Sequence, residues 1–207
     1  MRPHSLVACT LTLIAVATAS QAQSTAPASA PPVTTGSVVQ RDVNQEKRIE
    51  QGLQSGALTT REAARLQREE AHVDRMEADA LKDGKLSAQE KARITRAQNE
   101  VSRDIKAAKQ NDVHGNPASA SSQRMQADVQ RNIKQQQRIE QGVQSGALTQ
   151  HEAARLEAGQ AHVAAKEARA GRDGHVSAAE HARVQHAENK QSRHIRHEKH
   201  DAQDTAK

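Results

Sequence analysis

The stretch "KRIEQGLQSGALTTREAARL" occupies residues 47–66, and "QRIEQGVQSGALTQHEAARL" repeats it at residues 137–156. The match continues without a gap from residues 41–111 to residues 131–201, an offset of 90, with about half of the positions identical. An internal duplication of this length predicts two structural units of the same fold. We call residues 41–111 repeat unit 1 and residues 131–201 repeat unit 2.

Each unit contains a shorter pattern twice: Gly, an apolar residue two positions on, then Ser or Thr with Glu three positions later. It occurs at residues 56–62, 84–90, 146–152 and 174–180. Gly commonly follows the last turn of a helix, and Ser or Thr with Glu three positions on forms a capping box at the start of the next. In unit 1 the pattern predicts helices near 42–54, 60–81 and 88–110, and unit 2 should have the same helices 90 residues later.

The chain is poor in large apolar residues. It has no Phe, Tyr or Trp among 207 residues, and alanine supplies much of its apolar content. Ala favours helix but buries little area. In the middle helix of unit 1, Leu66, Val73 and Ala80 form a narrow apolar stripe with Ala63 alongside. We therefore expect an all-α protein of two tandem three-helix units, of marginal stability, to which a partner or ligand contributes.

Residues 1–22 have the features of a secretory signal peptide, because Arg2 precedes an apolar run and Ser20-Gln21-Ala22 is a small-residue cleavage site. Leu6-Val7-Ala8-Cys9 imitates a lipoprotein box, but almost no hydrophobic region precedes Cys9. Cleavage near Ala22 is the better interpretation and predicts a periplasmic or secreted protein. Cys9 is lost with the signal, which excludes disulfides and thiolate metal sites.

Composition also predicts the segments that flank the two units. Residues 23–40 are expected to form a disordered leader, residues 112–130 a flexible linker rich in Ser, Ala, Gly and Pro, and residues 202–207 a disordered tail.

Residues 79–90 have the spacing of a calcium-binding EF-hand loop. Asp79, Asp83, Ser87 and Glu90 would fill positions one, five, nine and twelve. Leu81 falls on position three and cannot coordinate an ion. The capping box already explains Ser87 and Glu90, so calcium binding here is a weaker hypothesis than a simple helix start.

Histidine is concentrated in unit 2: eight of the eleven His residues lie after position 150. Unit 2 has His where unit 1 has other residues at His151, His175, His181, His186, His194, His197 and His200. His72 and His162 are common to both units and are expected to serve packing or capping.

The segment "HIRHEKHD" at residues 194–201 is the densest part of this enrichment. Residues three and four apart lie on one face of a helix, and imidazole with carboxylate suits zinc, copper or nickel. The predicted metal ligands are His194, His197, His200, Glu198, Asp201, His181 and His186. The competing interpretation is that these His residues are solvated polar groups that charge at low pH.

Several classes of function are not expected. The chain has no nucleophile elbow, phosphate loop or HExxH motif, so we do not expect an enzyme. Its net charge is +5, but charges of both signs alternate along the chain and aromatic residues are absent. Nucleic-acid binding and an integral membrane span are therefore not predicted.

The motifs "RIEQGLQSGALTTREAARL", "DGKLSAQEKARI" and "NEVSRDI" resemble small exported proteobacterial envelope proteins with degenerate EF-hand-like units. The similarity covers residues 41–111 and again 131–201. It implies an exported helical protein but no particular activity.

Three functional hypotheses follow from the sequence. The first is a non-enzymatic periplasmic protein that binds or buffers a divalent metal through the His-rich helix of unit 2. The second is a structural or interaction module of the cell envelope, whose Ala-lined stripes pack on a protein partner or a second copy. The third is weak calcium binding at residues 79–90.

Overall fold

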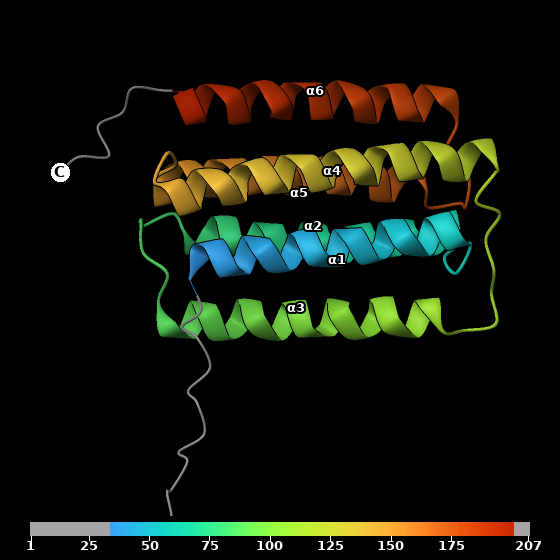
Figure 1. The fold of residues 1–207 in the computed structure, drawn as a ribbon, viewed down its shortest axis with the longest axis horizontal. Coiled ribbons are helices and arrows are strands. Elements are labelled where there is room, and N and C mark those ends of the chain that lie inside the picture. The colour runs from blue at the N-terminus through green and yellow to red at the C-terminus, as the bar shows by residue number, and fades with distance from the viewer. Residues whose placement is uncertain (1–33, 201–207) are drawn as a thin grey trace, which may run out of the picture. The chain divides into compact units, whose positions relative to one another are not determined.

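The computed structural model describes residues 34–200, so the predicted signal peptide, most of the predicted leader and the predicted tail lie outside the described range. The described part consists of helices joined by turns, with no strand, and the all-α prediction is confirmed (Figure 1). The helices are α1 (Thr35–Ser55), α2 (Thr60–Ala80), α3 (Ala88–Lys109), α4 (Ala120–Ser145), α5 (Gln150–Ala170) and α6 (Ala178–His200).

Capping boxes start five of these helices, and four of them are the ones that the repeated pattern predicts; the fifth joins Thr34 and Ser37 at the start of α1. In α2, Thr59 Oγ1 accepts the Glu62 N–H at 3.2 Å, and Glu62 Oε2 accepts the Thr59 N–H at 2.9 Å. The same exchange starts α3, α5 and α6, through Ser87–Glu90, Thr149–Glu152 and Ser177–Glu180.

The glycines of the repeated pattern play two different roles. Gly56 and Gly146 cap α1 and α4 with φ of 75° and 74°, the left-handed conformation that favours glycine. Gly84 and Gly174 do not cap a helix directly. They lie in the turns that follow α2 and α5, which have already ended at Ala80 and Ala170.

The first helix of each unit begins earlier than predicted. α1 begins at Thr35, and α4 begins at Ala120, so part of the predicted leader and much of the predicted linker are helical. The reason is that apolar residues recur at helical spacing in these two segments, although the overall composition of the segments is typical of a leader or a linker. Val39 and Val43 are buried in α1, and Met125 and Val129 in α4, four residues apart on one helical face.

The chain between α3 and α4 lies against the turn between α1 and α2. The Gly115 N–H donates to the Gly56 carbonyl at 2.8 Å, and Asn111 Nδ2 donates to Glu62 Oε1 at 2.6 Å. The predicted linker therefore divides into an irregular segment held on unit 1 and the first turns of α4.

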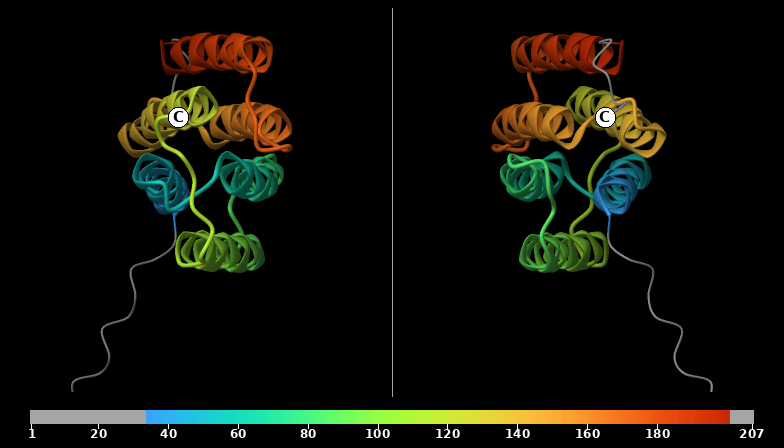
Figure 2. Two further views of the ribbon diagram at one scale, coloured as in Figure 1. Left: turned by 90° about the vertical axis from the view of Figure 1, so that its right-hand side faces the viewer. Right: turned by 90° about the vertical axis from the view of Figure 1, so that its left-hand side faces the viewer.

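The two repeat units pack face to face. End on, the pair α1 and α2 faces the pair α4 and α5, while α3 and α6 lie on the outer sides (Figure 2). α1 runs antiparallel to α4, and α2 to α5 (Figure 1). Side chains join the units at both ends: Thr35 Oγ1 donates to Gln150 Oε1 at 2.7 Å, and Arg61 Nη2 donates to the Asp173 carbonyl at 2.8 Å. We call the surface between the two units the seam.

The residues of the predicted apolar stripes are buried inside the protein. Leu66 and Val73 belong to a buried cluster that also contains residues of unit 2, and Leu81 packs against Ala153 and Ala154. The one large hydrophobic residue that is well exposed between residues 34 and 200 is Val113, at 53%. None of the described helices combines the length and apolar character that a membrane span requires.

Candidate functional site

Most of the predicted calcium ligands are engaged in local turns. Ser87 and Glu90 bind each other in the capping box of α3, which lowers the pKa of the Glu90 carboxyl through hydrogen bonds from Ser87. Asp83 Oδ1 accepts the Lys85 N–H at 2.9 Å, which closes the turn after α2.

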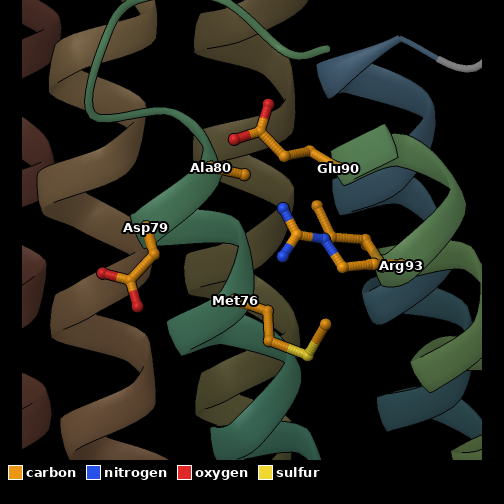
Figure 3. Close-up of a pocket in the computed structure, with 6 residues that line it drawn as sticks. Met76, Asp79, Ala80, Glu90 and Arg93 are labelled. Atoms are coloured by element: carbon orange, nitrogen blue, oxygen red, sulfur yellow. The ribbon is translucent and has the colours of Figure 1, made fainter. Parts of the chain in front are cut away.

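Asp79 and Glu90 both line a pocket of about 200 Å³ between α2 and α3. Their carboxylates nevertheless point in different directions, and the Arg93 guanidinium extends into the space near Glu90 (Figure 3). Asp79 forms its ion pair with Lys82 instead. Leu81, at the third loop position, is 2% exposed because it packs in the seam.

The predicted metal ligands of α6 have different surroundings. His194 Nε2 lies 3.0 Å from Glu198 Oε1, so the expected pairing four residues apart is present. Glu198 also accepts two hydrogen bonds from Arg155 of α5, at 2.8 and 3.2 Å. His197 and His200 are exposed.

The remaining predicted ligands are dispersed. His181 Nε2 lies 3.1 Å from Asp128 Oδ1 of α4, and burial lowers the pKa of its imidazole, as do Arg124 and Arg131. His186 lies in a groove between α5 and α6. Asp201 lies outside the described residues. Between residues 34 and 200, no three His, Cys, Asp or Glu side chains are grouped as a metal site would require.

The most unusual feature of the described structure is a set of carboxyl groups inside the seam. None of these side chains is more than 4% exposed. We call them the seam carboxyls: Asp42 and Glu46 of α1, Glu70, Asp74 and Glu77 of α2, and Glu157 and Glu167 of α5.

Amide side chains partner several of the seam carboxyls. In unit 1, Gln67 Nε2 donates to Glu46 Oε2 at 2.7 Å. Gln98 Nε2, from α3, lies 2.7 Å from Asp42 Oδ1 and 3.2 Å from Glu77 Oε1. A neutral amide can donate to a carboxyl in either protonation state, but it brings no charge to balance a carboxylate.

Unit 2 contains the same network with several acids and amides exchanged. Gln136 corresponds to Glu46, and Glu157 corresponds to Gln67. Gln136 Nε2 donates to Glu157 Oε2 at 3.3 Å. Gln136 also reaches across the seam to Asp74 Oδ1 at 3.4 Å.

At three further positions unit 2 replaces a seam carboxyl by a neutral residue. Asn132, Gln160 and Ala164 occupy the places of Asp42, Glu70 and Asp74. The acids of the seam are therefore concentrated on the unit 1 side.

No positive charge accompanies these carboxyls into the interior, because no Lys, Arg or His between residues 34 and 200 is buried. Neither carboxyl oxygen of Glu70 has a hydrogen-bond partner among the described residues. An ionised carboxylate in such surroundings is several kcal/mol less stable than in water, so the neutral form is favoured.

The pKa values move in the direction that this geometry requires. Burial raises the pKa of Asp42 to about 7, and that of Glu46 and of Glu157 to about 8. For Glu70, Asp74, Glu77 and Glu167 burial, followed by repulsion between neighbouring carboxyls, raises the pKa well above the ordinary range.

Charges outside the set of seam carboxyls modify this effect. Arg41 and Arg75 lower the pKa values of Asp42 and Asp74, respectively. Asp128 of α4 and Glu188 of α6 raise that of Glu167. Repulsion and burial exceed the attraction of the two arginines in every case.

These carboxyls are not among the predicted site residues, although the sequence contains a signal for them. In α2 the stripe reads Leu66, Glu70, Val73, Glu77, Ala80, with spacings of four and three throughout. Alternate positions of the apolar stripe are therefore acidic, so the glutamates share the buried face. Acidic side chains are usually solvated, so the same spacing predicts burial for the apolar residues and not for the glutamates.

Comparison of the chain with protein-family models, curated proteins and solved structures returned no match. The resemblance to exported EF-hand-like proteins stays a prediction that rests on the quoted motifs.

Proposed function

We propose that this is a non-enzymatic, acid-responsive helical protein, in which protonation of the seam carboxyls holds the two repeat units together. The observation that carries the proposal is the burial of seven carboxyl side chains between the units without any buried cation among the described residues. Protons are the counter-charge that such an interior can accept without rearrangement.

The proposed response has a definite direction. The folded-state pKa values of Asp42, Glu46 and Glu157 lie above their ordinary values of 3.8 to 4.5. Their contribution to stability is therefore complete below about pH 4 and is lost as the pH rises towards 8. Ionisation places like charges on α1, α2 and α5, and their mutual repulsion and hydration favour separation of the units.

Separation would expose the apolar faces that the closed form covers. Leu66 and Val73 of α2 and Leu156 and Val163 of α5 are buried when the units are closed. The interaction-module hypothesis then takes a specific form: these faces can bind a protein partner or a second copy only after the two units separate. The predicted export signal supports a role where the surrounding pH varies.

The test is to follow helicity, thermal unfolding and molecular mass from about pH 4 to pH 9. The triple variant Asp42→Asn, Glu46→Gln, Glu70→Gln carries the residues of unit 2 at the same positions. The proposal expects wild-type stability to fall with rising pH and the variant to show a shallower fall. A matched control replaces the exposed Glu100 and Asp112 by Gln and Asn. Equal pH profiles for all three proteins would refute the proposal.

Metal binding remains a second candidate, supported by the 3.0 Å approach of His194 Nε2 to Glu198 Oε1. Calorimetric titration with zinc, copper, nickel and calcium tests it. The variant His194→Ala, His197→Ala, His200→Ala should abolish transition-metal binding, whereas Asp79→Ala with Glu90→Ala should leave it intact. Absence of binding by the wild-type protein would exclude this candidate without affecting the seam proposal.

A further inference from the structure

A groove of about 550 Å³ runs between α5 and α6 in unit 2. Its charged lining consists of Arg155 and Lys166 from α5 and Arg183 and Lys190 from α6. Three imidazoles, of His162, His186 and His194, and the amide of Gln191 complete the polar lining, and no carboxylate lines it. The groove is therefore cationic at neutral pH.

The equivalent groove of unit 1 is a control within the same chain. It lies between α2 and α3, has a volume of about 370 Å³, and is lined by Glu69, Glu100 and Asp104 as well as by arginines. Unit 2 has Gly159, Lys190 and His194 at those three positions. Unit 2 also has Lys166 where unit 1 has Met76. Each of these four differences makes the unit 2 groove less acidic or more basic.

Two of the four permanent cations are lysines, and neither lysine has an ion-pair partner among the described residues. No carboxylate of the described residues lies within ion-pair distance of Lys166 or Lys190. Arg155, by contrast, is fixed in place by Glu198 at 2.8 Å. Two flexible ammonium groups beside an anchored guanidinium suit an anion with several charges.

The floor of the groove is polar and closely fitted. Gln191 Nε2 donates to the Leu156 carbonyl at 2.8 Å. Its amide occupies the space beside Gly159, where an added Cβ would lie 2.1 Å from Gln191 Oε1. In unit 1 Glu69 and Val101 stand at the positions of Gly159 and Gln191. Because residue 159 is a glycine, the uncharged Gln191 amide fills the space that in unit 1 belongs to the Glu69 side chain.

We infer that the α5–α6 groove is a binding site for a compact anion that carries two or more phosphate groups. The volume exceeds what a single phosphate fills, and the cations lie on both helices, so that separate phosphates can be held at once. The chain has no Phe, Tyr or Trp to form a large stacking surface for a nucleobase, so recognition is expected to depend on the phosphates.

His162 supplies a reporter inside the groove. Burial lowers the pKa of its imidazole, and the neighbouring positive charges of Lys166, Arg169 and Lys190 lower it further. A bound polyanion neutralises those charges, so the His162 pKa should rise on binding.

The probe for the test is inorganic tripolyphosphate, titrated calorimetrically at about pH 5.5, where the closed form is favoured and helicity is checked first. Saturable binding that weakens with salt is expected. The variant Lys166→Met, Lys190→Glu, His194→Asp carries the unit 1 residues and should weaken binding by roughly tenfold or more. The reciprocal variant Met76→Lys, Glu100→Lys, Asp104→His should gain binding in unit 1.

Two further measurements decide the outcome. Nuclear magnetic resonance titration of His162 should show its pKa raised by tripolyphosphate in the wild type but not in the Lys166→Met, Lys190→Glu, His194→Asp variant. Vesicles of phosphatidylcholine, with and without cardiolipin, whose headgroup carries two phosphates, show whether a lipid headgroup can supply the anion. No saturable binding in either arm, or equal binding by this variant and the wild type, overturns the inference.

Discussion

Gln67 donates a hydrogen bond to Glu46 across 2.7 Å in the interior of the protein, and the two positions reappear in unit 2 as Glu157 and Gln136 with the acid and the amide exchanged. The exchange keeps one carboxyl and one amide in each pair. Both units thus keep an acid–amide contact at these positions, and the contact forms without a buried cation among the described residues.

The clearest prediction concerns pH. Between about pH 4 and pH 8 the free energy of unfolding should fall, because the seam carboxyls bind protons more tightly in the folded than in the unfolded chain. The triple amide variant Asp42→Asn, Glu46→Gln, Glu70→Gln should be more stable than the wild type at pH 8 by roughly 2–4 kcal/mol. Urea unfolding at several pH values measures this, and a variant that is less stable at pH 8 would contradict it.

The exchanged pair gives a second prediction. Glu46→Gln combined with Gln67→Glu reproduces the arrangement of Gln136 and Glu157 and should retain near-wild-type stability at pH 5. Gln67→Glu alone places a second carboxyl beside Glu46 and should destabilise the protein by roughly 1–3 kcal/mol at pH 8. A double-mutant cycle of thermal unfolding gives the coupling, which should favour the exchanged pair. Strict additivity would show that the contact contributes nothing.

A third prediction separates the calcium hypothesis from the observed packing. Leu81→Asp places an oxygen ligand at the third position of the loop, so a functional loop should gain calcium affinity. Leu81 instead lies buried against Ala153 and Ala154, so the new carboxylate should destabilise the closed form by roughly 3 kcal/mol at pH 7. Circular dichroism melts with and without calcium distinguish the two, since calcium should not restore the lost stability.

The fourth prediction concerns the turn between α1 and α2. A Cβ added at Gly52 would lie 2.5 Å from Leu58 Cδ1, and Leu58 is buried. Gly52→Ala should therefore lower the free energy of unfolding by roughly 1–3 kcal/mol. Gly36→Ala is the matched control, because its Cβ would meet nothing closer than Gln144 Cγ, at 3.3 Å. Denaturant unfolding should show little change, or a small gain from helix propensity, for the control.

Local sequence is enough to predict most of the helix starts of this protein. The capping boxes at Thr59, Ser87, Thr149 and Ser177 placed four helix starts correctly, because a cap depends only on residues within one turn. The first helix of each unit was placed too late. Its early turns carry apolar residues such as Val39 and Met125 at helical spacing, and burial of these residues against other helices stabilises the turns.

Tertiary structure decided what the polar residues do. Glu70 and Glu77 lie in a polar-looking helix, yet packing of unit 1 on unit 2 removes them from water. His186 and His194 were predicted metal ligands, yet they line a groove together with Lys166 and Lys190. A sequence records which groups a helix carries and where the helix begins. Whether a carboxyl is solvated or buried, and which charges meet across a groove, depends on contacts between segments distant along the chain.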